Sequence, residues 1–207
     1  MSVDYWWIGL FVDQRMHARL EPHFATAAAK SCLSPEAERV IAAWREQPSD
    51  YEEAARVATA ETRNKVNAFL KTFNRSGFVA LGRQLLSRNG ALADLMSGPG
   101  IFRMATISRH PPVSIVWHAL GFERAKELPG QMGNMLLHPA QVEAALEATR
   151  RAYAGPSPDD LFAAAKRYCG ASVDDWPLRG ALSFQPEGLE AALERDEGFF
   201  ALTCPRI

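Results

Sequence analysis

The side chains best suited to chemistry in this sequence are histidines, of which there are five. His118 lies in an apolar segment, and His138 directly precedes a proline at the expected end of a strand. His110 lies in the stiff loop Ser-Arg-His-Pro-Pro, which Arg109 makes cationic. Functional side chains often gather in such loops and at strand ends. We therefore take His118, His138 and His110 as candidate catalytic residues, although a histidine in an apolar segment is more often a core residue with satisfied hydrogen bonds.

A second set of side chains could hold a ligand. Arg103, Arg109 and His110 form the neighbourhood where we expect an anionic ligand, if one binds, because charged donors make strong hydrogen bonds to anions. Asn134, just ahead of the segment Met-Leu-Leu, completes the ligand-binding candidates. The predicted ligand-binding residues are thus Arg103, Arg109 and Asn134.

Metal and cofactor motifs are absent from the sequence. There is no G-x-S-x-G, H-E-x-x-H, G-x-x-x-x-G-K-[ST] or G-x-G-x-x-G pattern. Asp13, His17 and Glu21 are spaced four apart, but Asp13 is better used as a helix cap, and Pro22 is expected to end that helix. We expect no metal and no cofactor.

Composition restricts the partners and the compartment. The net charge is −1, and the basic residues form no dense cluster, so nucleic-acid binding is not expected. The three cysteines, Cys32, Cys169 and Cys204, form no C-x-x-C pair, which indicates a reducing compartment. No signal peptide or membrane-spanning segment is apparent. We expect a cytoplasmic protein that does not bind membranes.

Tryptophan side chains are candidates for partner contact. Trp6 and Trp7 are adjacent in an apolar segment, and on a strand their rings would point to opposite faces. One ring can enter a core, whereas the other needs a second layer, a ligand or a partner. We name Trp6, Trp7 and Trp117 as candidate partner contacts, since tryptophan often anchors protein interfaces.

The first half of the chain must supply mainly helices. Residues 5–12 read as a buried strand. Ser34-Pro35-Glu36 predicts a helix start, with the helix running to about Gln47. A capping box at 50–53 predicts the longest helix, with Gly77 as its left-handed cap, and a further helix reaches residue 89. We expect a helical insertion over about 34–97.

The second half should return to strands and helices, over about 101–207. Residues 101–107 predict a strand, and 113–122 favour a helix slightly over a strand. Residues 135–147 and 182–194 echo each other, and each predicts a short strand followed by a helix that begins near a proline. Another helix should begin at about 157, and residues 199–203 read as a last strand. The similarity between the two segments is equally compatible with an ancestral duplication and with two independent occurrences of the same helix-start pattern.

The second half also resembles a known family. Trp-His-Ala-Leu at 117–120, Met-Leu-Leu-His-Pro-Ala-Gln-Val-Glu at 135–143, and the final helix and strand at 189–202 resemble the YfbM-like family of bacterial domains of unknown function. The resemblance covers about half the chain, and the first hundred residues do not share the family's short opening. It implies a small α+β domain and assigns no catalytic residue.

These observations predict one α+β domain over 1–207, with a small mixed or antiparallel sheet packed against several helices. For function, they favour a cytoplasmic domain that binds another protein, for example an immunity or accessory protein. The alternative is a small-metabolite enzyme whose pocket is assembled from His118, His138 and the Arg109–His110 loop. Whether the protein is an enzyme stays open at this point.

Overall fold

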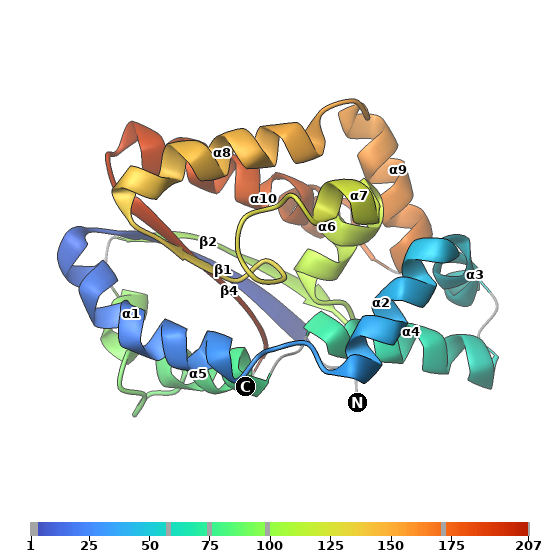
Figure 1. The fold of residues 1–207 in the computed structure, drawn as a ribbon, viewed down its shortest axis with the longest axis horizontal. Coiled ribbons are helices and arrows are strands. Elements are labelled where there is room, and N and C mark those ends of the chain that lie inside the picture. Colours follow the sequence, from blue (N-terminus) through green and yellow to red (C-terminus); the bar gives the residue numbers. More distant parts are fainter. Residues whose placement is uncertain (1–3, 57–58, 74–75, 98–99, 171–172, 207) are drawn as a thin grey trace.

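One antiparallel sheet organises the molecule (Figure 1). The computed structural model describes residues 4–56, 59–73, 76–97, 100–170 and 173–206, without the side chains of 53–56. The strands are β1 (Asp4–Val12), β2 (Ile101–Ser108), β3 (Met135–Leu137) and β4 (Gly198–Pro205), in the order β2-β1-β4-β3. All three pairings are antiparallel. The predicted α+β fold is confirmed. Of the mixed and antiparallel sheets that the sequence allowed, the structure has the antiparallel one.

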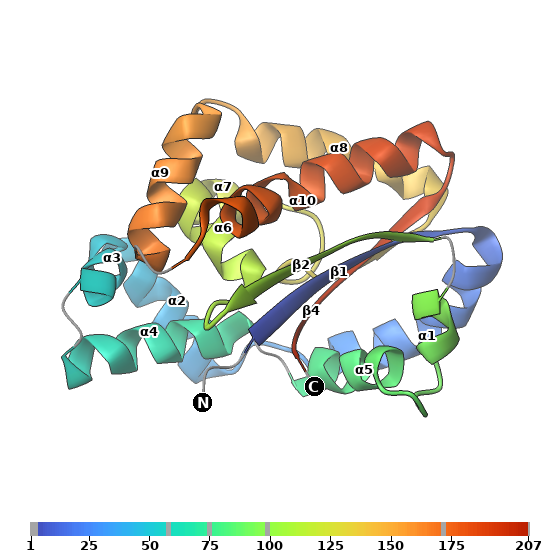
Figure 2. The ribbon, with the colours of Figure 1, turned by 180° about the vertical axis from the view of Figure 1, so that it is seen from behind.

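Helices cover both faces of this sheet (Figures 1 and 2). One face carries α1 and α5, and the other carries α6, α8 and α10, while α2, α3, α4 and α9 gather at one end. The helices are α1 (Gln14–Ala29), α2 (Pro35–Glu46), α3 (Ser49–Arg56), α4 (Ala60–Phe73), α5 (Ser76–Leu86), the 3₁₀ helix η1 (Ala93–Ser97), α6 (Pro112–Leu120), α7 (Phe122–Ala125), α8 (Pro139–Tyr153), α9 (Pro158–Cys169) and α10 (Asp175–Glu194).

The strand β1 separates two apolar cores. Ile8 and Leu10 point toward α1 and α5, and Trp7 and Phe11 point toward the opposite core. The Trp7 ring stacks on Phe184 of α10 at a centroid distance of 4.2 Å. Because both faces are covered, this strand is apolar at successive positions instead of alternating.

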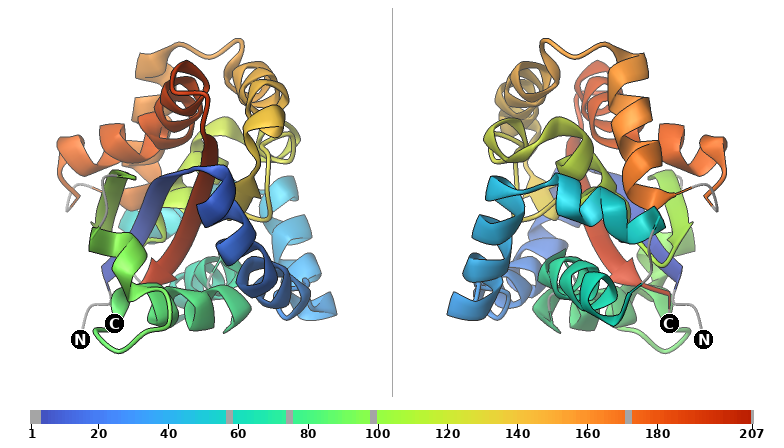
Figure 3. Two further views of the ribbon diagram at one scale, coloured as in Figure 1. Left: turned by 90° about the vertical axis from the view of Figure 1, so that its left-hand side faces the viewer. Right: turned by 90° about the vertical axis from the view of Figure 1, so that its right-hand side faces the viewer.

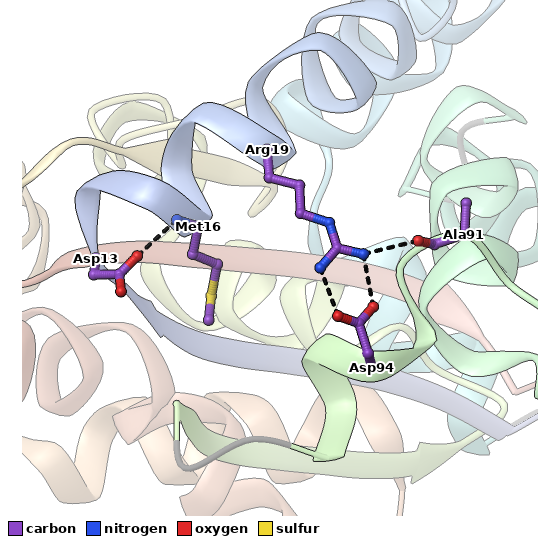
Figure 4. A network of polar contacts seen from close by, with 5 residues as sticks. All are labelled: Asp13, Met16, Arg19, Ala91 and Asp94. Carbon is purple, nitrogen blue, oxygen red and sulfur yellow. Dashed lines mark hydrogen bonds and ion pairs between the residues drawn. The ribbon is translucent and has the colours of Figure 1, made fainter.

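Polar contacts fix α1 against the segment that follows α5 (Figure 4). The Asp13 carboxylate accepts a hydrogen bond from the Met16 amide at 2.6 Å, as the predicted cap should. The Arg19 guanidinium donates to both oxygens of Asp94, at 2.5 and 2.7 Å, and to the Ala91 carbonyl at 3.0 Å. This bidentate pair lowers the pKa of the Asp94 carboxyl, chiefly through the Arg19 hydrogen bonds.

Two expectations for α1 and α5 are wrong. The helix α1 continues through Pro22, because Leu20 and Ala27 are both buried and their packing outweighs the lost backbone hydrogen bond. Gly77 does not cap a helix but lies inside α5. A Cβ atom there would lie 2.1 Å from the Ala27 carbonyl oxygen, so the glycine permits close contact between the two helices.

The helix predicted to be longest is two helices, α3 and α4. Residues 57–58, including Ala58 of the predicted apolar stripe, lie outside the described residues. Thr59 Oγ1 accepts a hydrogen bond from the Thr62 amide at 3.2 Å and thereby caps a new helix start. The stripe persists at Phe69 and Phe73, which are buried in α4. The helix α10, with 20 residues, is longer than either.

The two echoed segments adopt different structures. The first forms β3 and then α8, as predicted. The second, including 182–186, lies within the continuous helix α10, so the strand predicted there is wrong. Pro186 cannot donate to the Leu182 carbonyl four residues earlier, and the Tyr153 hydroxyl of α8 donates to that carbonyl instead, at 2.8 Å. The replacement donor keeps the helix intact across its proline.

Candidate functional site

His118 lies at a junction of four helices. The helix α6 begins after Pro111, and its residues are almost all buried. The prediction that residues 113–122 favour a helix over a strand is confirmed. The imidazole is 6% exposed and contacts Trp44 of α2, Glu52 of α3 and Tyr168 of α9. The segment called apolar in the sequence is therefore the centre of a polar network.

Both nitrogens of His118 are engaged within the chain. Trp44 Nε1 donates to Nδ1 at 3.1 Å, and Nε2 lies 3.0 Å from Glu52 Oε1. An indole nitrogen can only donate, so Nδ1 must be unprotonated and Nε2 must carry the proton that faces Glu52. Neither a free lone pair nor an exposed proton is left for a substrate.

The network ends on an arginine and a tyrosine. Glu52 Oε2 accepts from Arg167 Nε at 3.0 Å, so the carboxylate is paired on both oxygens. The Tyr168 ring stacks on His118 at 4.4 Å with an interplanar angle of 13°. Burial lowers the pKa of His118, and the hydrogen bond to Glu52 opposes this only in part. The imidazole is therefore neutral near pH 7.

His110 approaches the same tyrosine from the end of β2. The His110 and Tyr168 rings pack edge to face, with their centroids 5.1 Å apart. The Nδ1 atom of His110 is buried without a hydrogen-bond partner among the described residues. Burial, with smaller contributions from Arg109 and His118, lowers its pKa to about 4. The structure thus brings His110 and His118 to one ring, as neutral side chains.

His138 lies elsewhere, at the start of α8. Its Nδ1 accepts a hydrogen bond from the Ala140 amide at 3.3 Å, and the Gln141 side chain accepts from its backbone amide at 2.8 Å. The ring also meets the edge of His17 at 5.4 Å. Because Nδ1 accepts, Nε2 carries the proton and offers no lone pair to a metal. No contact among the described residues joins His138 to His118.

The three ligand-binding candidates are dispersed as well. Arg103 donates to Ser183 Oγ at 3.0 Å and pairs with Glu187, both in α10. Arg109 follows β2 with a φ of +70° and is exposed. Asn134 is fully buried, where its Oδ1 accepts from the Thr203 amide at 2.7 Å and its Nδ2 donates to the Gln131 and Met132 carbonyls. Asn134 thereby joins its loop to β4.

The predicted tryptophan contacts are mostly interior. Trp7 is fully buried, with its indole N–H bonded to the Gly133 carbonyl at 3.0 Å, and Trp117 is 8% exposed. Trp6 is half-buried, and Arg206 lies over its ring at 5.9 Å. The exposed tryptophan is one that sequence reasoning did not select, Trp176 in the first turn of α10, which is 82% exposed.

An open groove lies beside the His118 network. It encloses about 340 Å³ between α2, α3 and α4 and contains no histidine among its lining residues. Its polar rim includes the ion pair between Lys65 and Asp50 at 3.1 Å. The lining residues are Glu36, Arg39, Val40, Ala43, Gln47, Asp50, Tyr51, Lys65 and Ala68.

Other chemistry has little support in the part of the chain that the structure describes. No group of three or more histidine, cysteine, aspartate or glutamate side chains could hold a metal ion there. Burial raises the pKa of the Cys169 and Cys204 thiols to about 12, so both are protonated at neutral pH and are weak nucleophiles. None of the described helices combines the length and apolar character needed to cross a bilayer.

No family model, no curated protein and no solved structure matches the chain.

Sequence reasoning missed the partners of His118 and the exposed tryptophan. Glu52 and Arg167 are separated from His118 by 66 and 49 residues respectively, so no local spacing could connect them. Trp176 did carry a local signal. It follows two aspartates and precedes a proline, a composition that suits a helix start at the surface and not a core.

Proposed function

We propose that this chain is a cytoplasmic protein-binding domain, such as a bacterial immunity or accessory protein, that recognises its partner through the start of α10. The observation that carries the proposal is the 82% exposure of Trp176. A tryptophan side chain presents a large apolar area, and tryptophan is enriched among the residues that dominate interface energies.

The backbone that carries Trp176 is held in place by neighbouring contacts. The Lys166 ammonium donates to both the Asp175 carboxylate and the Val173 carbonyl, each at 2.7 Å. One turn later, the Arg179 guanidinium lies 4.2 Å above the Phe162 ring. An anchor on such a fixed helix start loses little conformational entropy on binding, which favours affinity.

The contacts of the histidines give less support to the alternative, a small-metabolite enzyme. Catalysis by His118 would require it to exchange a proton, but Trp44 occupies Nδ1 and Glu52 occupies Nε2. His138 belongs to a helix cap in another part of the molecule. Of the predicted pocket, contacts among the described residues bring together His110 and His118, which share the Tyr168 ring, and do not include His138.

Affinity capture from extracts of the source cells tests this proposal. We expect the wild-type chain and Leu193→Ala to retain a specific protein. Trp176→Ala should fail to retain it, because its dissociation constant should rise at least tenfold. Leu193 is a matched control, because it is also on α10 and is 44% exposed. Equal recovery of every protein by all three baits would contradict the proposal.

A further inference from the structure

The open groove beside α2, α3 and α4 has the size and the lining of a small-molecule site. Both α2 and α3 pack against α4 at one end of the molecule (Figure 3, right). The groove encloses about 340 Å³, which is at the lower end of the range for small-ligand pockets. Its apolar wall is formed by Val40 and Ala43 of α2 and Ala68 of α4, none of which is fully buried. An apolar group placed there would shield this wall from water.

A buried hydroxyl group lines the groove without a partner. Tyr51 is 4% exposed, and its ring packs against Phe69 with the centroids 5.3 Å apart. Its hydroxyl makes no hydrogen bond to a described residue. The charges of Lys65 and Asp50 both act on this hydroxyl, so it lies beside the ion pair on the rim. Burial raises its pKa, so at neutral pH the hydroxyl is protonated and can donate to a ligand.

The ion pair beside Tyr51 has bonding capacity left on both of its members. Lys65 Nζ donates to Asp50 Oδ2 at 3.1 Å, which uses one of the three ammonium protons. The other carboxylate oxygen, Asp50 Oδ1, accepts no hydrogen bond from the described residues. Both side chains are partly exposed, 46% for Lys65 and 36% for Asp50. One end of the groove therefore offers unused donors and an unused acceptor close together.

We propose that this groove binds a free α-amino acid with an apolar side chain. The ligand carboxylate accepts hydrogen bonds from the Tyr51 hydroxyl and Lys65 Nζ, and the ligand ammonium donates to Asp50 Oδ1. The ligand side chain covers the apolar wall at Ala43 and Ala68. The inference goes beyond the proposed function, because Trp176 is not among the residues that line the groove.

The charges of the lining favour a ligand that carries both signs. The lining has two acidic side chains, Glu36 and Asp50, and two basic ones, Arg39 and Lys65, so its formal charge is balanced. Such a balance gives no general attraction for a simple anion or a simple cation. A carboxylate alone would leave Asp50 Oδ1 without a donor. An α-amino acid carries its ammonium and carboxylate groups on one carbon atom, so it can satisfy both members of the ion pair at once.

Titration of the purified chain followed by two-dimensional amide NMR tests the inference. The probe is L-phenylalanine, and the comparators are 3-phenylpropanoate, which lacks the ammonium group, and 2-phenylethylamine, which lacks the carboxylate. We expect L-phenylalanine to bind with a dissociation constant of about 1 mM or below, as its small size allows. The shifted amides should lie in α2, α3 and α4. Each comparator should bind about tenfold more weakly, because it loses one charge-assisted hydrogen-bond set.

Variants assign the binding to the named groups. Tyr51→Phe removes the hydroxyl and keeps the ring on Phe69, and Lys65→Met removes the ammonium; each should raise the dissociation constant about tenfold. Lys71→Met is the matched control, because Lys71 is also exposed on α4 but does not line the groove, and it should stay within twofold. The melting temperatures of all three should stay close to the wild-type value. Trp176→Ala should bind L-phenylalanine as the wild type does.

The absence of saturable shifts at about 20 mM L-phenylalanine would overturn the inference. Binding of either comparator as tightly as L-phenylalanine would overturn the assignment to an amino acid. Unchanged affinity in both Tyr51→Phe and Lys65→Met, or shifts outside the three helices, would overturn the site. The proposed function is tested separately, since loss of a protein partner in Trp176→Ala leaves this result as it is.

Discussion

Removing the Tyr153 hydroxyl should weaken α10 at its proline. The hydroxyl donates to the Leu182 carbonyl at 2.8 Å, and Leu182 is 9% exposed. Pro186, which occupies the position that would normally donate to this carbonyl, has no N–H. Tyr153→Phe therefore leaves a buried acceptor without a partner, which costs about 1–3 kcal/mol of unfolding free energy.

A double-mutant cycle isolates this effect from general repacking. In a Pro186→Ala background, residue 186 regains its N–H and can serve the Leu182 carbonyl, so Tyr153→Phe should then cost less than about 0.5 kcal/mol. The coupling energy between the two positions should be about 1 kcal/mol. Pro186→Ala alone should be close to neutral, since the gained hydrogen bond offsets the greater entropy of the unfolded chain.

Urea denaturation followed by circular dichroism measures the four free energies. Tyr5→Phe is the control, because burial alone, without any hydrogen bond among the described residues, raises the pKa of the Tyr5 hydroxyl, so its removal should cost less than about 0.5 kcal/mol. Equal losses from Tyr153→Phe in both backgrounds would refute the reasoning, since the carbonyl would then not be shared.

Three further predictions follow from the buried contacts. His118→Phe keeps the stacked ring but deprives Trp44 and Glu52 of their partner, so urea denaturation should show a loss of about 3 kcal/mol; a loss below 0.5 kcal/mol would be inconsistent with the network. The pKa of His110 is about 4 in the fold, below its ordinary 6.5, so stability is full above pH 6.5 and should fall by up to about 3 kcal/mol between pH 6.5 and 4. His110→Phe should reduce that slope, and a slope unchanged in the variant would assign it to other groups. Gly77→Ala drives a methyl group into the α1 backbone and should lower the melting temperature by several degrees, whereas an unchanged value would deny the close helix contact.

Local patterns predicted the elements whose determinants are local. The apolar segment of β1, the Asp13 cap and the Ser34-Pro35 helix start are all in the structure as expected. Each depends on residues within about four positions of one another. The same is true of His138, whose side chain caps the helix that begins at the next residue.

The echoed segments show where such patterns fail. Both contain a proline after short apolar runs, but His138 is extended and caps a helix, whereas Gln185 lies inside one. The difference depends on Tyr153, which is 29 residues from Leu182 in sequence. A donor supplied by tertiary packing cannot be found from the spacing around the proline.

The site was predicted only in part, for a similar reason. The sequence selected His118 and His110, but the side chains that contact their rings come from α2, α3 and α9. Trp7 and Trp117 were chosen for their residue type, and the strand and helix that carry them are covered on both sides. Trp176 was the tryptophan left outside, because the first turn of α10 extends beyond its supporting helices (Figure 3).

Photo-crosslinking in the source cells tests recognition through the start of α10 most directly. A benzophenone amino acid in place of Trp176 should give a specific protein adduct, and the same group in place of Leu193 should not. Adducts of equal yield at both positions, or no protein adduct at position 176, would contradict the account.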